Sequence, residues 1–309
     1  MKLFVAGFIL FLLCLNSCSS TKIELTMTSD KPYPDSSYDF SMATSIKKDT
    51  IFFGSSRLNE RVLPYRSMKG DSLNIRIWFP GGQHVDSTKL ILLVPGFHDE
   101  PYELFPLAIA STKRGIITAI LSPRSIDVNR KCADDFGINE IQDAEDAFSA
   151  YQKTYNLPPL KIAAFGCSLG SVVALNLAVK DARVQVAVCE SMMSDPVVTS
   201  KKLLSSAESD ELQSLISSGG IHTADFSPET VIKEFPKEKK LFVDWGEKDK
   251  LISPEEQAHL QTLIGQYVPS ATFKQIPGIG HVLRYGFPLS QQEALLLNEK
   301  IISFLVGSL

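Results

Sequence analysis

The amino-acid sequence predicts an α/β domain in which a mostly parallel central sheet is covered by helices on both faces. Three observations support this fold class. Apolar runs of strand length alternate with helix-length stretches, and strands joined through helices form parallel sheets. The 309 residues, 44% of them hydrophobic, fit one large domain with an ample core. A glycine-flanked pentapeptide, residues 166–170, connects a strand-like run to a helix-like run.

The N-terminus has the pattern of an exported protein. A short positive start is followed by an apolar run at residues 3–15, and the small residue Ser17 precedes Cys18. This pattern resembles the bacterial lipobox, so we expect a signal peptide at 1–17, a lipid on Cys18 and a polar tether at 18–41. A plain cleaved signal peptide fits the same residues. A transmembrane anchor fits less well, because the run is shorter than the about 20 residues that span a bilayer.

The remaining residues, 42–309, are expected to form the α/β domain. Residues 42–70 carry only short, weakly patterned strands, and we expect a hairpin or extension packed on the edge of the sheet. The central strands are better defined, because each is an apolar run bounded by polar or turn residues. They are expected at 73–79, 90–94, 116–121, 160–165, 184–188, 241–243 and 272–276.

Two of the helices have clear sequence signals. Apolar residues at 138–155 recur close to the 3.6-residue helical period. Further along, Ser253 has the features of an N-cap, Pro254 is suited to the first helical position, and Glu256 completes a capping box. We therefore expect a helix that runs from this point toward Tyr267.

The pentapeptide Gly166-Cys167-Ser168-Leu169-Gly170 follows the strand expected at 160–165 and opens the helix expected at 171–180. In that context, a Gly-x-Ser-x-Gly sequence describes a nucleophile elbow, a turn so tight that only glycines fit the flanking positions. Ser168 would then stand at the carboxyl end of a strand. An ordinary strand-to-helix connection made of small residues is the alternative interpretation.

The partners that a serine nucleophile needs follow in the chain. Asp249 lies in a polar loop after the strand at 241–243, and His281 follows the strand at 272–276. A serine hydroxyl is a poor nucleophile at neutral pH, so His281 is expected to accept its proton and Asp249 to orient the imidazole. Asp195, after the strand that follows the pentapeptide, is the alternative acid, because some members of the family that these motifs resemble place the acid there.

With these motifs, the chain resembles the serine α/β-hydrolases, in particular small esterases, over residues 73–306. The matching pieces are 90–97, 166–170, 246–249 and 278–281. The resemblance implies an α/β-hydrolase fold with the chain order Ser, Asp, His. It also implies an oxyanion hole formed by the backbone N–H groups of Phe97 and Leu169.

The resemblance places a small helical cap at residues 191–236, where the strand and helix alternation is interrupted. An ordinary pair of surface helices fits this segment equally well. The helical prediction depends on apolar residues with helix-like spacing: Met192, Met193, Leu203, Leu204, Leu212, Leu215 and Ile216.

Further polar residues lie near the expected site. His98 is a candidate substrate contact, and Asp99 and Glu100 beside it are better explained as anions at a helix N-terminus. Arg124 is a candidate for binding a substrate carboxylate or phosphate, although surface arginines are common. The segment 121–127 replaces a glycine-rich segment of many relatives, which leaves the substrate class open.

Composition excludes several other functions. The net charge is −4, and acidic and basic residues are mixed along the chain, so no basic stripe for nucleic acid is present. The cysteines do not indicate a disulfide framework, and no Cys/His pair has metal-ligand spacing. We expect no cofactor and no metal, and no protein partner can be read from the sequence.

The sequence therefore predicts a serine hydrolase of the bacterial cell envelope, anchored to a membrane by a lipid on Cys18. Its expected reaction is cleavage of a carboxylic ester in a small-molecule acyl substrate. A peptidase or a thioesterase with the same residues is the second interpretation. A lipoprotein that kept the fold as a non-catalytic binding module is the third.

Overall fold

The computed structural model describes residues 50–53, 56–80, 86–96, 104–122, 138–200, 202, 210, 213–214, 217, 225–281 and 291–309. The predicted signal peptide at 1–17, the tether at 18–41 and Cys18 lie outside these residues. Within the described part, the strands form one sheet in the order β1-β2-β3-β5-β4-β6-β7-β8-β9. Their bounds are Thr50–Phe53, Ser56–Arg66, Ser72–Pro80, Lys89–Val94, Ile117–Leu121, Lys161–Cys167, Val184–Glu190, Lys240–Gly246 and Thr272–Ile276, from β1 to β9.

The sheet is antiparallel at one edge and parallel elsewhere. Strands β1, β2 and β3 pair in antiparallel order, and β3 joins the rest by antiparallel pairing with β5. From β5 through β4 to β9, all neighbours are parallel. The predicted α/β class with a mostly parallel sheet is confirmed. The segment 42–70, expected as a hairpin or extension, supplies β1 and β2, two of the three antiparallel strands at this edge.

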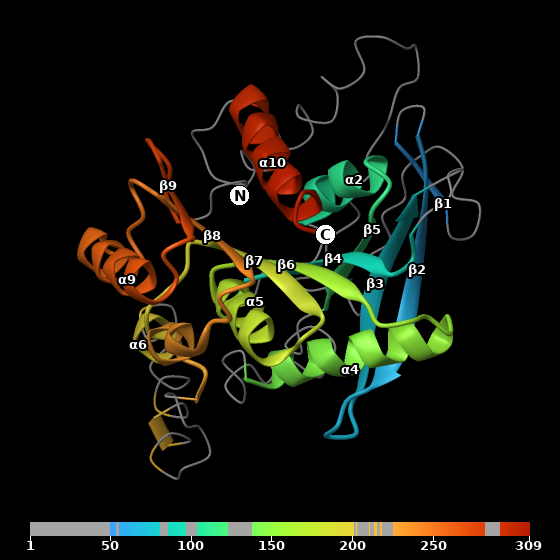
Figure 1. The fold of residues 1–309 in the computed structure, drawn as a ribbon, viewed down its shortest axis with the longest axis horizontal. Coiled ribbons are helices and arrows are strands. Elements are labelled where there is room, and N and C mark those ends of the chain that lie inside the picture. The colour runs from blue at the N-terminus through green and yellow to red at the C-terminus, as the bar shows by residue number, and fades with distance from the viewer. Residues whose placement is uncertain are drawn as a thin grey trace.

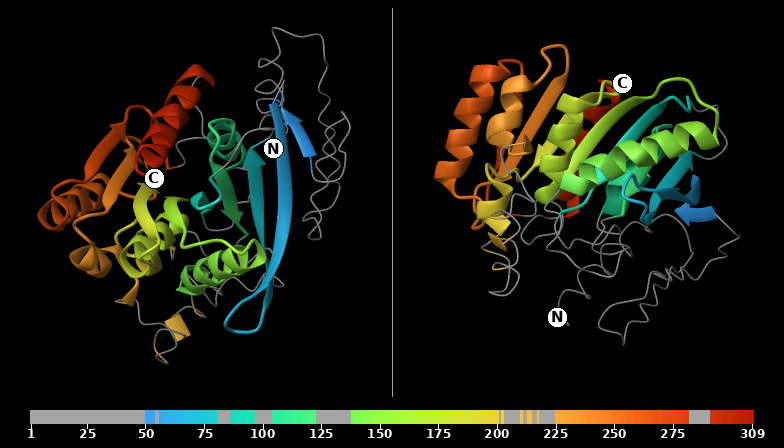
Figure 2. Two further views of the ribbon diagram at one scale, coloured as in Figure 1. Left: turned by 45° about the vertical axis from the view of Figure 1, so that its right-hand side comes forward. Right: turned by 90° about the horizontal axis from the view of Figure 1, so that it is seen from below.

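Helices cover both faces of the sheet (Figure 1). The helices α2 (Phe105–Lys113) and α10 (Gln291–Val306) lie on one face, and α4 (Ile138–Thr154), α5 (Leu169–Lys180) and α9 (Pro254–Tyr267) lie on the other. Figure 2 shows these layers from two further sides. Because both faces are covered, a central strand such as β4 reads as an unbroken apolar run, with alternate side chains entering the two cores.

The short helices of the described part are α6 (Pro196–Ser200), α8 (Pro228–Val231) and the 3₁₀ helix η5 (Ile232–Glu234). They belong to the segment 191–236 that was expected to form a cap. Met192 and Met193 are two of the residues that predict the cap, but they precede α6 and are fully buried in the core that contains α5 and α9. The five other apolar residues of the cap prediction lie outside the described residues.

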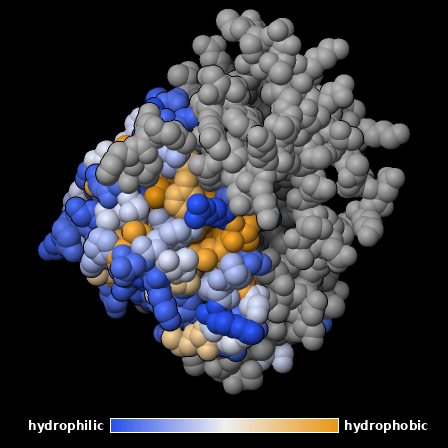
Figure 3. Space-filling view, turned by 90° about the vertical axis from the view of Figure 1, so that its right-hand side faces the viewer, coloured by the Kyte–Doolittle hydropathy of each residue, from blue (hydrophilic) through white to orange (hydrophobic). Residues whose placement is uncertain are grey.

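The face of the molecule shown in Figure 3 carries both hydrophobic and hydrophilic side chains. Val62 of β2 is 49% exposed. On the other face of this strand, the Arg61 guanidinium carbon lies 5.4 Å from the ring centroid of Phe79 and 5.9 Å from that of Tyr155. A cation placed over two aromatic rings shields them from water.

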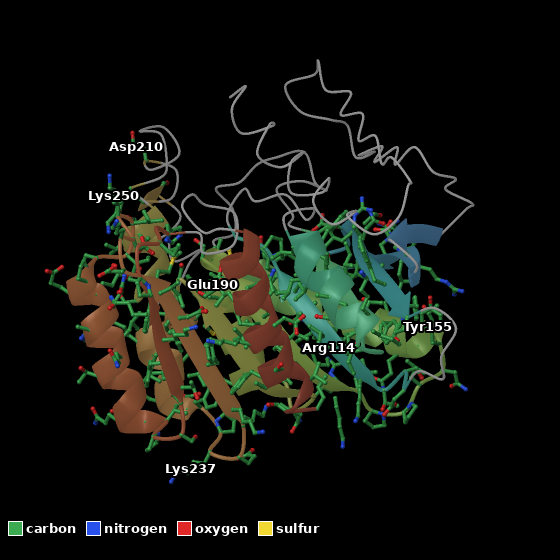
Figure 4. All side chains as sticks on the ribbon, turned by 90° about the horizontal axis from the view of Figure 1, so that it is seen from above. Arg114, Tyr155, Glu190, Asp210, Lys237 and Lys250 are labelled. Atoms are coloured by element: carbon green, nitrogen blue, oxygen red, sulfur yellow. The ribbon has the colours of Figure 1, made fainter. Side chains whose placement is uncertain are left out.

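The parallel strands end at a common edge, which is where ligands bind in sheets of this kind. Figure 4 shows Glu190, the last residue of β7, and Lys250, in the loop after β8, toward the carboxyl ends of the parallel strands. Lys237, which precedes β8, lies toward the amino ends. The predicted residues Ser168, Asp249 and His281 all follow the carboxyl ends of parallel strands, β6, β8 and β9.

Candidate active site

Ser168 lies between β6 and α5 in a strained backbone conformation, with φ 53° and ψ −121°. A positive φ is costly for a residue with a side chain and persists only where the surroundings impose it. Here the flanking glycines allow it. A Cβ on Gly166 would lie 1.9 Å from the carbonyl oxygen of Gly170, and a Cβ on Gly170 would lie 2.3 Å from that of Val94. The turn is therefore as tight as the pentapeptide predicts.

The structure brings the three predicted side chains together. The Nε2 atom of His281 lies 2.9 Å from the Ser168 hydroxyl oxygen, and its Nδ1 atom lies 2.8 Å from Oδ2 of Asp249. A carboxylate only accepts hydrogen bonds, so Nδ1 carries the proton. In the neutral imidazole, Nε2 is then free to accept the proton of the Ser168 hydroxyl. This arrangement is the one that a serine nucleophile needs.

The Asp249 carboxylate is fixed through both of its oxygens. Its side chain is completely buried, and Oδ1 accepts hydrogen bonds from the backbone N–H groups of Leu251, at 2.8 Å, and Ile252, at 2.9 Å. Oδ2 is left to face His281, whose side chain is 20% exposed. The acid therefore points at the imidazole in a defined orientation, while the imidazole keeps access to solvent on one side.

The acid loop and the histidine loop are joined directly to each other. A Cβ on Gly246 would lie 2.1 Å from the carbonyl oxygen of Gly280, so the two backbones touch. The backbone N–H of Lys248 donates to the carbonyl of Ile279 at 2.7 Å. The Glu247 carboxylate accepts the backbone N–H of Gly278, also at 2.7 Å. In the sequence these loops are two separate motifs, and nothing in either motif points to Glu247.

Ser191, which follows β7, is a further residue that sequence reasoning missed. It has a positive φ of 50° and is fully buried. Its backbone N–H donates to the carbonyl of Asp244 at 2.8 Å, and its hydroxyl donates to the backbone carbonyl of His281. A single serine between a strand and a pair of methionines gave no signal of this role.

The alternative acid, Asp195, is engaged elsewhere. Its Oδ1 accepts the backbone N–H groups of Val197, at 2.8 Å, and Val198, at 3.1 Å, which is the geometry of a helix N-cap at the start of α6. Of the two candidate acids, Asp249 is the one that contacts His281.

The oxyanion pair is described only in part. Leu169 is buried at the N-terminus of α5, where the first backbone N–H groups of a helix have no partner within the helix. Phe97 lies outside the described residues, as do His98, Asp99, Glu100 and Arg124. The helix end beside Ser168 is thus suited to stabilise negative charge.

The cysteines near Ser168 are part of the core. Cys167 and Cys189 are both buried thiols, and burial raises the pKa of Cys189 far above its usual range, which keeps that thiol protonated. Within the described residues, no group of three His, Cys, Asp or Glu side chains is arranged to hold a metal ion. No helix in the same part of the chain is long and apolar enough to cross a membrane.

No family model matches the sequence, and no curated protein matches it at a significant level. Solved structures do match. The acylaminoacyl peptidase of Pyrococcus horikoshii has a TM-score of 0.64 and 11% identity, over 82% of this chain and 42% of that chain. The chain has the α/β-hydrolase fold.

Two other matches show the range of activities found on this fold. An esterase of Pyrococcus furiosus has a TM-score of 0.60 and 15% identity, over 81% of this chain and 93% of that chain. Dipeptidyl peptidase 4 of Porphyromonas gingivalis has a TM-score of 0.60 and 16% identity, over 81% of this chain and 36% of that chain. The chain therefore spans less than half of either peptidase and almost the whole esterase. Its structural neighbours include both esterases and peptidases.

Proposed function

We propose that the protein is a serine hydrolase that cleaves a carboxylic ester by transferring the acyl group to water. The observation that carries the proposal is the continuous relay from the Ser168 hydroxyl through both nitrogens of His281 to Asp249, with bonds of 2.9 and 2.8 Å. The strained backbone at Ser168 costs free energy of folding, and such strain is typical of functional sites. It is also the arrangement of groups by which a serine is activated.

In the proposed reaction, the Ser168 oxygen bonds to the substrate carbonyl carbon while His281 Nε2 takes the hydroxyl proton. The carbonyl electrons move to oxygen, and the resulting negative charge is stabilised by the backbone N–H groups of Leu169 and Phe97. His281 then returns the proton to the alcohol oxygen as the ester C–O bond breaks. Water repeats the same steps on the acyl-serine and releases the acid. Asp249 holds the imidazole in the required tautomer throughout.

Two observations favour an ester over an amide. The chain matches nearly the whole length of the Pyrococcus furiosus esterase, at 93% of that chain. In contrast, it matches only 42% and 36% of the two peptidases, so most of each peptidase has no counterpart here. A peptidase is the second candidate, because the same fold and the same order of groups serve both reactions. A thioesterase would use the same residues.

The first test is reaction of the full-length protein with a fluorophosphonate probe, which labels only an activated serine. We expect labelling of the wild type and none of Ser168→Ala. An unlabelled, folded wild type would contradict the proposal and favour a binding module.

The second test is turnover of p-nitrophenyl esters of increasing acyl length beside the matched p-nitroanilides and thioesters. Faster turnover of the anilides than of the esters would replace the esterase by the peptidase.

We also propose that the enzyme is attached to a membrane of the bacterial cell envelope by a lipid on Cys18. The support is the apolar run at 3–15 and the small residue before this cysteine. A fatty-acid analogue supplied to expressing cells is expected to label the wild type and Cys14→Ala, but not Cys18→Ala. Equal labelling of Cys18→Ala, or none of the wild type, would overturn this part of the proposal.

A further inference from the structure

The loop that carries Asp249 is closed by a side chain from the helix that follows it. The loop leaves β8 at Gly246 and reaches α9 after Ile252. Gln257, in the second turn of α9, is 5% exposed and extends its amide between these two points. Its Nε2 atom lies 3.3 Å from the carbonyl oxygen of Gly246 and 3.1 Å from that of Ile252. One side chain therefore bonds to both ends of the loop.

The orientation of the Gln257 amide is set from a third side. Its Oε1 atom accepts a hydrogen bond from Nε2 of Gln275, on β9, at 3.3 Å. Two backbone carbonyls can only accept, so the amide nitrogen has to face them and the amide oxygen has to face Gln275. Both polar atoms of this buried amide thus have hydrogen-bond partners. A buried polar group with all its partners fixes the local geometry, whereas an unpaired one would destabilise the fold.

Ile252, whose carbonyl oxygen accepts a hydrogen bond from Gln257, also contacts the acid. The peptide unit before Ile252 supplies one of the two N–H groups that hold Oδ1 of Asp249, at 2.9 Å. The bond to Gly246 holds the end of the strand, and the N–H of Asp249 itself donates to that same carbonyl at 3.3 Å. A shift of Gln257 would therefore move the Ile252 N–H group, which helps to orient the carboxylate, relative to the strand that supports the loop.

We propose that Gln257 is a positioning residue, which sets the Asp249 carboxylate against His281 by holding the two ends of the acid loop at a fixed separation. This inference rests on the proposed function, since it assigns a role in that reaction. It differs from simple stabilisation of α9, because a stabilising residue would affect folding without changing the geometry of the acid and the imidazole.

The test compares Gln257→Met with Gln261→Met in the full-length protein. Methionine keeps the length of glutamine and lacks its donors. Gln261 lies one turn further along α9 and is exposed, so it serves as the matched control. We expect Gln257→Met to lower kcat on the best p-nitrophenyl ester by about 10-fold with little change in KM, because small displacements of catalytic groups are costly. Gln261→Met is expected to match the wild type.

A double-mutant comparison separates positioning from stability. If Gln257 acts through Asp249, then adding Gln257→Met to Asp249→Asn will lower kcat no further, because the group being positioned has already been changed. An equal 10-fold loss in both backgrounds would overturn the proposal, as would a wild-type kcat for Gln257→Met. If Gln257→Met does not fold, Gln257→Glu is used: its carboxyl donates to a carbonyl only when protonated, so its kcat relative to wild type should fall as pH rises.

A measurement that needs no turnover distinguishes failure of this inference from failure of the proposed function. The proton on Nδ1 of His281, held by a carboxylate, should give a proton NMR signal far downfield of the other imidazole signals. We expect this signal in the wild type and in Gln261→Met, and we expect it to be shifted or lost in Gln257→Met. If the protein cleaves no ester, this signal still decides whether Gln257 positions the pair. An unchanged signal in Gln257→Met would contradict the inference.

Discussion

The two halves of the candidate active site differ in how far they depend on hydrogen bonds. On the nucleophile side, backbone presses on backbone: a Cβ on Gly166 would lie 1.9 Å from the carbonyl oxygen of Gly170. The side of the acid and the histidine has one such contact, between Gly246 and Gly280, but its side chains are oriented by hydrogen bonds, such as those that Asp249 accepts and the one from Gly278 to Glu247. The glycines of the first half tolerate no added atom, whereas the side chains of the second half depend on particular donors and acceptors.

This difference predicts how each half responds to substitution. Steric contact between backbones cannot be relieved by a side-chain rotation, so a change in the elbow should disturb the fold itself. A lost hydrogen bond costs less stability, about 0.5–1.5 kcal/mol. Its effect on the alignment of the reacting groups can nevertheless be large. We therefore expect substitutions of the elbow glycines to act on folding, and substitutions of the hydrogen-bonding side chains on the other side to act on kcat.

The largest effect is expected for Gly166→Ala. The added methyl group overlaps backbone atoms of Gly170, so the free energy of unfolding should fall by more than about 4 kcal/mol, or the protein should fail to fold. Gly265→Ala is the matched control, because Gly265 lies in α9 and a Cβ added there would have no neighbouring atom within 4 Å. That change should stabilise the helix by about 0.5–1 kcal/mol. Urea unfolding measures both, and a mild effect of Gly166→Ala would refute the steric account.

The next effect is expected for Asp249→Asn, which acts on catalysis. The amide keeps the size of the carboxylate and can accept only through its oxygen, so it no longer favours the proton on Nδ1 of His281. The kcat for an ester should fall by about 10⁴-fold, with KM and the urea midpoint changed much less. Asp195→Asn is the control and should retain nearly all activity. If Asp195→Asn were inactive and Asp249→Asn active, the acid would be misassigned.

The difference between the two halves also explains what could be predicted from the sequence. The elbow requires glycine at two positions around Ser168. This requirement can be recognised in the sequence as the spacing of the two glycines from the serine. The strand expected at 241–243 was too short, because β8 runs through the buried Asp244 to Gly246. A charged residue inside a buried strand interrupts the apolar run from which the bounds of the strand are predicted. Similarly, β6 extends to Cys167 because it pairs with β7 as far as Glu190.

The supporting residues of the acid and the histidine could not be predicted in the same way. Gln257 and Ser191 are common polar residue types, and glutamine on a helix is ordinarily a surface residue. Their roles arise because they reach backbone carbonyls of segments that the fold brings close, as Ser191 reaches His281 across 90 positions of the chain. The spacing of residues within one segment does not reveal a contact between distant segments. Such a contact can be seen only in the folded structure, where the carboxyl ends of the strands lie together.

The smallest of these effects is expected at Ser191, where strain and hydrogen bonding can be separated. Ser191→Ala removes the hydroxyl that donates to the backbone carbonyl of His281 and keeps the strained φ of 50°. Ser191→Gly removes the same hydroxyl but relieves the strain, because glycine adopts positive φ freely. Both variants should lower kcat by the same factor, about threefold to 10-fold, because both lose the support of the histidine loop.

Stability should separate the same two variants. Ser191→Ala is expected to lower the free energy of unfolding by about 1 kcal/mol through the lost hydrogen bond, and Ser191→Gly should regain part of that loss by relieving the backbone. Urea unfolding and ester turnover, measured on the same preparations, decide the matter. Equal kcat for both variants with unequal stability would show that the hydrogen bond aligns His281 while the strain is a cost of folding. A kcat restored by glycine would show instead that backbone conformation sets the alignment, and the histidine side would then resemble the elbow.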